Sequence, residues 1–397
     1  MNTLRNLFIS IALLLLISGC KNEGSQLKTI IISDSSTNCP PEYKHMDNNA
    51  SLARDGSGNL WLIVPHGGVL YSTPWSVFKG TNMDNLVKQY ESDPSNTMFP
   101  RPYKDDTYWS GGLWIDSDGK WYCPTHIEFN YEKYGKFGHA FLSLQRRLCL
   151  TTSVDNGKTW VYEGDILTSD NSYNPSDWEG KQIFDQGPGD AQLYYDDEYL
   201  YLFFMDAWVV KEKWVRYCAV RAARCPKADK MSPGKWQKWY NGKWSEPGIG
   251  GHCTDVFNYG GTETASVFYS TYLKKYCALV SGGNGGKDFS VNPDLFFSTC
   301  SDLKKQDWTT PIKVASAGKN GFYNWAVDKT TSSRMVIDGS SFRYYTAGGM
   351  PVPRWYDVNF VDLDRKFKNV VLPPVYPPEP VNDFNPGWDP VHCPQNK

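Results

Sequence analysis

Residues 109–131 read WSGGLWIDSDGKWYCPTHIEFNY. The stretch predicts a strand over 111–116, a tight Ser-Asp-Gly turn at 117–119 and a second strand over 120–125. Asp-Gly between two runs of aromatic and β-branched residues is the strongest short-range hairpin signal in a sequence. The second strand runs on into His126 and Glu128, which lie two residues apart and would share one strand face. This stretch therefore predicts a fold element and a candidate site at its end.

Four further stretches repeat the hairpin pattern, at 50–64, 191–204, 265–280 and 334–347. Equivalent positions recur about every 60 to 80 residues, and a second strand pair follows each hairpin, as at 148–160 and 296–308. Four strands per repeat are typical of a β-propeller blade. We therefore predict an all-β, five-bladed β-propeller over residues 39–370, with long loops at 75–108, 129–140, 161–189 and 226–262. A β-sandwich or two smaller β domains is the alternative, and the Pro-rich residues 371–397 are expected to form a surface strap.

The N-terminus has the pattern of a targeting segment. Arg5 precedes an apolar run over 7–17, which is short for a transmembrane helix. The residues Leu-Ile-Ser-Gly-Cys that follow resemble a bacterial lipobox. This resemblance implies a signal peptide over 1–19, lipidation of Cys20, a polar tether over 20–38, and a lipid-anchored protein of the cell envelope, on the periplasmic face of the outer membrane or on the cell surface. An ordinary cleaved signal peptide is the alternative.

Composition narrows the class of partner. The chain of 397 residues has a net charge of −2, so it lacks the basic surplus expected of a nucleic-acid-binding protein. Aromatic residues make up 15% of it; they suit the apolar faces of sugars but also fill β cores. The aromatic stretch 233–251 could be a sugar-stacking wall or packing between blades. We expect a monomer that acts on an oligosaccharide, with no cofactor and no metal site.

Ten cysteines occur in the chain. If Cys20 is lipidated, an odd number remains in an oxidising compartment. Cys39 and Cys393 flank the predicted propeller and could staple its ends. Two further pairs, Cys123 with Cys149 and Cys277 with Cys300, occupy matching places in two repeats and could be either disulfides or buried thiols.

Polar residues at the inner ends of the blades are the candidates for chemistry. Inner strands of a propeller line its channel, and the loop after each second strand returns to the same face. The residues at these two places are Asn49, Ser110, Asp190, Glu263, His66, His126, Glu128, Asp206 and Ser281.

Hydrolysis of a glycoside requires two carboxyl groups that flank the bond. Asp190 in GPGDAQLYYDD (187–197) and Glu263 in GGTETASVFY (260–269) resemble the channel acids of five-bladed arabinanase-like hydrolases. That family also has an acid in the first blade. In the third repeat, Asp190 lies six residues before the turn residue Asp196. The residue six positions before the equivalent turn residue of the first repeat, Asp55, is Asn49, and Asp47 would fit only with a two-residue shift.

Elimination at a uronic acid requires a base, an acid and a cation for the substrate carboxylate. His126 is the candidate base or acid and Tyr134 its partner, while Arg216 or Arg221 would bind the carboxylate, since arginine binds carboxylates with two parallel hydrogen bonds. Substrate contacts are expected from His66, Trp109, Glu128, Asp190, Asp206 and Glu263. In the structural alternative, the histidine is a satisfied turn residue and the arginines are surface charges.

A resemblance favours elimination. Residues 152–160, TSVDNGKTW, fit the Asp-box pattern of sialidases and other propellers, where it is a structural hairpin. Together with the lipobox, THIEFNY (125–131) and RYCAVRA (216–222), it looks like the propeller enzymes that degrade ulvan, a sulfated rhamnose–uronate polysaccharide. The resemblance implies an oligosaccharide dehydratase or polysaccharide lyase. The alternatives are a glycoside hydrolase using Asp190 and Glu263, and a non-catalytic sugar-binding lipoprotein.

Overall fold

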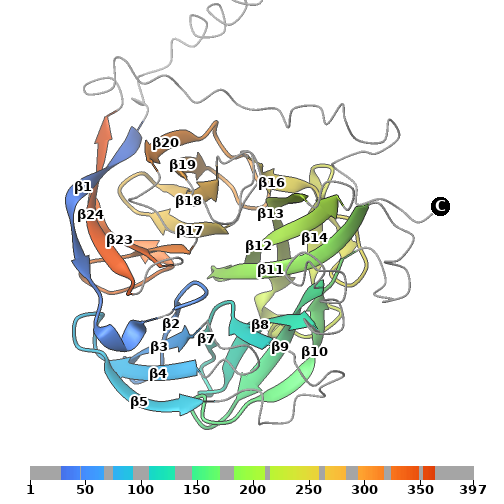
Figure 1. The fold of residues 1–397 in the computed structure, drawn as a ribbon, viewed down its shortest axis with the longest axis horizontal. Helices are drawn as coiled ribbons and strands as arrows, with labels where there is room; N and C mark the ends of the chain where they lie inside the picture. Colours follow the sequence, from blue (N-terminus) through green and yellow to red (C-terminus); the bar gives the residue numbers. More distant parts are fainter. Residues whose placement is uncertain are drawn as a thin grey trace, which may run out of the picture.

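The computed structural model describes residues 28–44, 46–66, 75–92, 107–129, 145–169, 183–210, 215–258, 264–282, 294–316, 323–347 and 352–362. Five antiparallel sheets surround a common centre, and β2, β11 and β17 lie nearest to it (Figure 1). This is the predicted five-bladed β-propeller with four main strands per blade. Within the described residues, no helix is long and apolar enough to span a membrane.

The strands of each blade follow one another from the centre outward. Blade 1 contains β2 (Ser51–Arg54), β3 (Leu60–Pro65), β4 (Trp75–Gly80) and β5 (Val87–Ser92). Blade 2 contains β6 (Thr107–Ser110), β7 (Trp114–Ile115), β8 (Trp121–Phe129), β9 (Gln145–Ser153) and β10 (Val161–Leu167). Blade 3 contains β11 (Ile183–Tyr195), β12 (Tyr199–Val210), β13 (Val215–Pro226), β14 (Gln237–Tyr240), β15 (Lys243–Pro247) and β16 (Asp255–Phe257). Blade 4 contains β17 (Thr264–Ser270), β18 (Lys275–Gly282), β19 (Asp294–Cys300) and β20 (Ile312–Ala315). Blade 5 contains β21 (Asn324–Val327), β23 (Ser341–Thr346), β24 (Arg354–Asp362) and β1 (Lys28–Asn38).

The ring follows from strands that are apolar on both faces. Successive side chains of a strand point to opposite sides of the sheet. In β3, Leu60, Leu62 and Val64 pack against blade 5, whereas Trp61 and Ile63 pack against blade 2. Similar clusters join blades 2 and 3, 3 and 4, and 4 and 5. Each fully buried aliphatic or aromatic side chain contributes about 1.5 to 3 kcal/mol, so each blade is stabilised through both neighbours.

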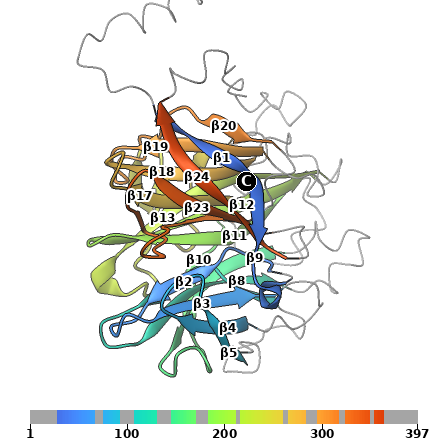
Figure 2. The same ribbon diagram turned by 90° about the vertical axis from the view of Figure 1, so that its left-hand side faces the viewer.

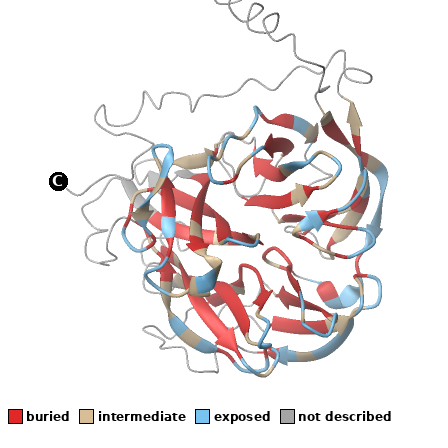
Figure 3. Ribbon diagram, turned by 180° about the vertical axis from the view of Figure 1, so that it is seen from behind, coloured by how far each residue is buried: buried red, intermediate tan, exposed pale blue. Residues whose placement is uncertain are grey.

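Burial has the same pattern across the molecule. Buried residues fill the inner strands, and exposed residues gather on the turns between strands (Figure 3) and on the outer strands β5 and β15. The Asp-box forms one such turn, between β9 and β10: the Ser153 hydroxyl donates to the Asp155 carboxylate over 2.7 Å, and the buried Trp160 packs edge-on against Trp75. It lies at the outer part of blade 2, as a structural hairpin.

The first and last strands of the described chain close the ring. β1 pairs antiparallel with β24 and becomes the outermost strand of blade 5 (Figure 2). Residues 28–38 were expected in a polar tether over 20–38; Ile30 and Ile32 instead bury their side chains against blade 5. The correction follows from their alternation of apolar residues, which suits a strand with one buried face.

Two other expectations need correction. The first strand of the fifth repeat is β21, rather than residues from 334 onward. Residues 336–337 form β22 (Val336–Ile337), which pairs parallel with β17 of blade 4. Three of the expected long loops contain outer strands: β4 and β5 lie within 75–108, β10 within 161–189, and β14, β15 and β16 within 226–262.

The described cysteines are free buried thiols. The two proposed pairs, Cys123 with Cys149 and Cys277 with Cys300, are therefore thiols, which the sequence had left open. Cys39 is also a free thiol, and Cys393, its expected partner, lies outside the described residues. Cys20 and the strap at 371–397 lie outside them as well.

Candidate functional site at the channel mouth

Three carboxyl groups from three blades lie close together around His126 and Trp109. Asp47 precedes β2 of blade 1, Glu128 lies near the end of β8 in blade 2, and Asp190 lies on β11 of blade 3. Burial raises the pKa of Asp47 to about 6, and repulsion from Asp190 and Glu128 adds to the rise. Interactions with Tyr323 and Trp109 offset part of it. Three acids from three blades thus share one small region.

Asp47 is held in place by the end of the neighbouring strand. Its backbone N–H donates to the carbonyl of Pro65 over 3.0 Å, and an isolated bridge pairs Met46 with His66. His66 is fixed through both ring nitrogens, one 2.8 Å from the Lys44 carbonyl and the other 2.7 Å from the Ser76 hydroxyl. The role predicted for His66 was substrate binding; its observed contacts support the backbone that carries Asp47.

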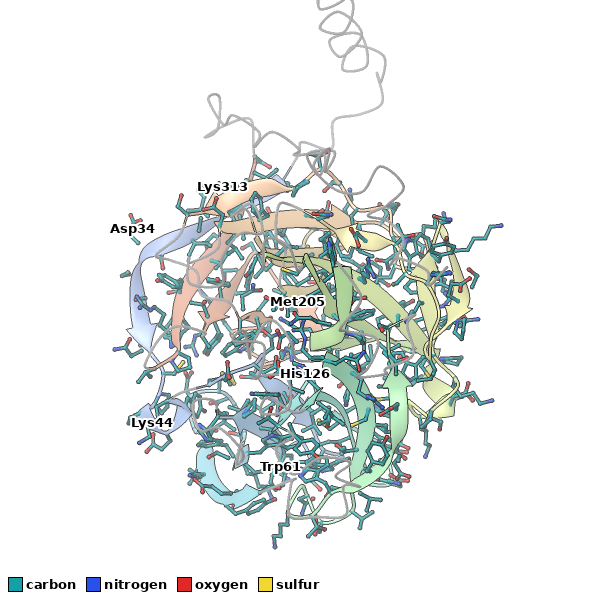
Figure 4. All side chains as sticks on the ribbon, turned by 45° about the vertical axis from the view of Figure 1, so that its right-hand side comes forward. Asp34, Lys44, Trp61, His126, Met205 and Lys313 are labelled. Carbon is teal, nitrogen blue, oxygen red and sulfur yellow. The ribbon has the colours of Figure 1, made fainter. Side chains whose placement is uncertain are left out.

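His126 lies between the other two carboxyl groups. Its Nδ1 is 3.3 Å from Oδ1 of Asp190, and its Nε2 is 3.8 Å from Oε1 of Glu128. The Asp190 backbone N–H also donates to Nδ1 over 3.3 Å. The ring is only 2% exposed, and Trp109 lies over it with ring centroids 5.2 Å apart. Figure 4 shows His126 well inside the ring of strands, whereas Lys44 lies at the periphery.

Gly189 covers this histidine. A Cβ atom at position 189 would lie 2.8 Å from Nε2 of His126 and 3.1 Å from Cδ of Arg146. The next residue, Asp190, has a φ of +40°, a left-handed conformation that is unusual outside glycine. The register of β11 against β12 also shifts between Gly189 and Gln192. The close packing of Gly189 and the bulge that follows it thus place Asp190 next to the buried imidazole of His126.

Arg146 was not among the predicted site residues. It lies on β9 directly opposite Glu128 and is 2% exposed. Its guanidinium is 4.0 Å from the Asp190 carboxylate and donates to the Gln186 side chain over 3.4 Å. The sequence signal was its position across from a strand-end acid, since cross-strand neighbours interact. A positive charge beneath two acids favours their ionised forms.

Arg221, expected to bind a substrate carboxylate, is already paired. Its guanidinium donates to Asp206 over 2.8 Å and to Asp255 over 2.9 Å, and it is 2% exposed. Burial raises the pKa of Asp255, although Arg221 opposes the rise. The trio has more negative than positive groups, so it is poorly suited to receive a uronate.

The remaining predicted residues are placed less fully. Trp109 is half-buried beside Asp47 and His126. Arg216 lies on β13, and its side chain is outside the description. Tyr134 and Glu263 lie outside the described residues, though Glu263 immediately precedes β17. Their roles stay predictions.

Two questions left open by the sequence are answered by packing. Asn49, the position expected from the residue count, is 1% exposed. Asp47 is the carboxyl group of the first blade that interacts with Asp190 and Glu128. In the aromatic stretch, Trp236 packs between blades 2 and 3, and Trp239 with Trp244 packs between blades 3 and 4. These tryptophans serve the blade interfaces.

The described residues include no group of three or more His, Cys, Asp or Glu side chains placed to hold a metal ion. The described part of the site contains three carboxyl groups, one imidazole and one guanidinium. Its available chemistry is proton transfer and nucleophilic attack by carboxylates.

No protein-family model matches the chain, and no curated protein matches it. Solved structures with a similar arrangement include an exo-β-1,3-galactanase from Phanerochaete chrysosporium (11% identity, 83% of this chain, 63% of that one, TM-score 0.48). Others are a family 117 glycoside hydrolase of Zobellia galactanivorans (10%, 85% and 91%, 0.49) and an α-L-arabinofuranosidase from Lactobacillus brevis (13%, 80% and 92%, 0.47). The chain spans less than two thirds of the galactanase. These similarities are too remote to assign a function to the chain.

Proposed function

We propose that this protein is a carbohydrate-active enzyme that hydrolyses glycosidic bonds at the channel mouth. The observation that carries the proposal is the convergence of Asp47, Glu128 and Asp190, close enough that the latter two help to raise the pKa of Asp47 to about 6. Glycoside hydrolysis uses two carboxyl groups in different protonation states. Asp47 would protonate the leaving oxygen, and Asp190 would activate water or attack the sugar.

The support for distinct roles is electrostatic. A carboxyl group with a pKa of about 6 keeps a useful protonated fraction near neutral pH, as a proton donor requires. Asp190 lies 4.0 Å from the Arg146 guanidinium, which favours its carboxylate form. Trp109 offers an aromatic surface beside Asp47 and His126, of the kind that packs against the apolar face of a sugar. Glu263, expected at the same rim, stays the alternative acid of the pair.

The geometry favours hydrolysis over elimination. A base for elimination must reach the substrate proton, but His126 is 2% exposed beneath Gly189, and its Nδ1 already accepts from the Asp190 backbone. Arg221 is paired with two carboxylates. In our proposal His126 orients Asp190 and Glu128 instead of reacting.

One experiment separates the three functions. The soluble domain is incubated with neutral and uronate-containing oligosaccharides, and each tube is followed for new reducing ends and for the ultraviolet absorbance of a C4–C5 double bond. We expect reducing ends without the absorbance, and their loss in Asp47→Asn and Asp190→Asn. Asp84→Asn, which removes an exposed carboxylate on an outer turn, is the control and should retain activity. The absorbance would support a lyase or dehydratase instead, and binding without either product would support a sugar-binding protein.

A further inference from the structure

Arg334 is a buried cation that the proposed chemistry does not use. It is 5% exposed and follows the turn that ends β21. The Asp328 carboxylate shapes this turn by accepting from the backbone of Thr331 over 2.6 Å and of Asp338 over 2.7 Å. The chain then continues to β22 on blade 4. Arg334 therefore sits where the chain crosses between two blades.

The guanidinium joins the two segments that carry the proposed catalytic acids. One of its nitrogens donates to the Ala50 carbonyl, three residues after Asp47. The other donates to the Gln192 side chain over 2.7 Å, two residues after Asp190. Both acceptors follow the acids within two or three residues of the same segment.

The same polar layer reaches the other inner strands. The Gln192 amide donates to the Asn324 carbonyl over 2.7 Å, and the Asn324 amide donates to Ser281 over 2.6 Å and to Thr264 over 3.3 Å. Thr264 directly follows Glu263. One connected set of buried hydrogen bonds thus joins the residues that follow Asp47 and Asp190 to the start of β17.

A positive charge is costly in this layer. Among the described residues, Arg334 forms no ion pair, and its partners are neutral oxygens. Burial lowers its pKa to about 10. A buried charge without a counter-ion destabilises a fold, so packing alone would be served better by an apolar side chain. What arginine offers is a rigid, planar fork that reaches two acceptors at once.

We propose that Arg334 is a positioning residue that fixes the separation between the Asp47 and Asp190 carboxyl groups. The proposal rests on the proposed function in one respect, namely that Asp47 and Asp190 are the two acids of the reaction. Without the fork, repulsion between the acids would push their segments apart. The lysine variant keeps the charge but loses the second arm, so it tests geometry separately from charge.

The test compares Arg334→Lys and Arg334→Met with the wild type. We expect kcat to fall about 100-fold in both with KM changed little, since a misplacement near 1 Å has this effect. In Arg334→Lys, carbon NMR of the Asp47 carboxyl should show its pKa moving from about 6 toward its ordinary value. Arg343→Met is the matched control, because Arg343 also links blade 5 to blade 1, through Asp84 on an outer turn, and it should retain kcat.

A second variant guards against misfolding. Gln192→Ala removes one acceptor and should reproduce the loss in kcat, and the double variant with Arg334→Met should lose no more than either single change, because both break one linkage. The proposal would be overturned if the folded Arg334 variants kept the wild-type kcat and Asp47 titration. It would also be overturned if Arg343→Met lost as much kcat as they do, or if the losses in kcat from Gln192→Ala and Arg334→Met added up in the double variant. If the wild type hydrolyses no substrate, the proposed function fails, whereas the Asp47 titration still decides the positioning role.

Discussion

Replacing Asp47 by asparagine should stabilise the protein at neutral pH while removing its activity. The Asp47 carboxyl has a pKa of about 6, against an ordinary value of 3.8. Each pKa unit corresponds to about 1.4 kcal/mol, so ionising this group in the folded state costs about 3 kcal/mol more than in the unfolded chain. Asparagine has the same shape and no charge to repel Asp190.

The sign follows from proton binding. Between pH 4 and 6 the folded state holds the Asp47 proton more tightly than the unfolded state, so this group lowers the free energy of unfolding as pH rises. The effect is complete above about pH 7, one unit above the folded-state pKa, where both states have lost the proton. The free energy of unfolding of Asp47→Asn should therefore equal that of the wild type at pH 4 and exceed it by about 3 kcal/mol at pH 8.

Urea unfolding of both proteins at pH 4 and pH 8 measures this difference, because the titrating groups that do not interact with Asp47 contribute equally in both proteins. Asp155→Asn provides the opposite sign: although burial opposes it, hydrogen bonds from Thr159 lower the pKa of Asp155, so this variant should lose stability at pH 8 and not at low pH. Activity should fall by about 100- to 10,000-fold in Asp47→Asn if the carboxyl donates a proton. An equal pH dependence of stability in the wild type and Asp47→Asn would refute the clustering of acids on which the site is built.

Three further predictions test neighbouring features. Gly189→Ala places a Cβ against His126 and should cost about 1 to 3 kcal/mol with a large loss of kcat, whereas Gly56→Ala, which meets no atom within 4 Å, should leave both thermal unfolding and kcat near wild type. Trp160→Ala should lower stability by about 3 to 5 kcal/mol in thermal unfolding yet retain kcat per folded molecule, because the Asp-box lies at the outside of blade 2; a selective loss of kcat would contradict this. Asp190→Asn should reduce turnover more than His126→Asn, because the carboxylate reacts while the imidazole only orients it, and the reverse ranking in the same kinetic assay would favour elimination.

The architecture could be read from the sequence because it depends on local patterns. The Asp-Gly turns and the runs that are apolar on both faces are visible in single hairpins, and only a closed ring gives every sheet two apolar neighbours. The fifth repeat misled for a local reason: Val336 and Ile337 look like a hairpin strand, but they pair with β17 of blade 4. Which sheet a short apolar segment joins is decided by packing, not by propensity.

The site could be read only in part. Glu128, Asp190 and His126 could be predicted because they lie next to recognisable hairpins. Counting residues back from the turn led to Asn49 instead of Asp47. The count fails because β11 contains a register shift and β2 is only four residues long, so the same number of residues spans different lengths in the two blades. Arg146 reaches the site across a hairpin from a third strand. Long-range placements of this kind arise from bulges and cross-strand reach, which sequence spacing does not encode.

The position of Asp47 links the chemistry to the closure of the ring. β1 belongs to blade 5 and β2 to blade 1, so residues 39–50 cross the seam between the first and last blades. The crossing segment is fastened on one side by Cys39, whose N–H donates to the Pro353 carbonyl, and on the other by Tyr43, which packs on Phe78. Asp47 lies within it and interacts with Tyr323 of the last blade and Trp109 of the second. The proposed proton donor is thus carried by the segment that closes the propeller, so its position relative to Asp190 depends on the contacts between the first and last blades.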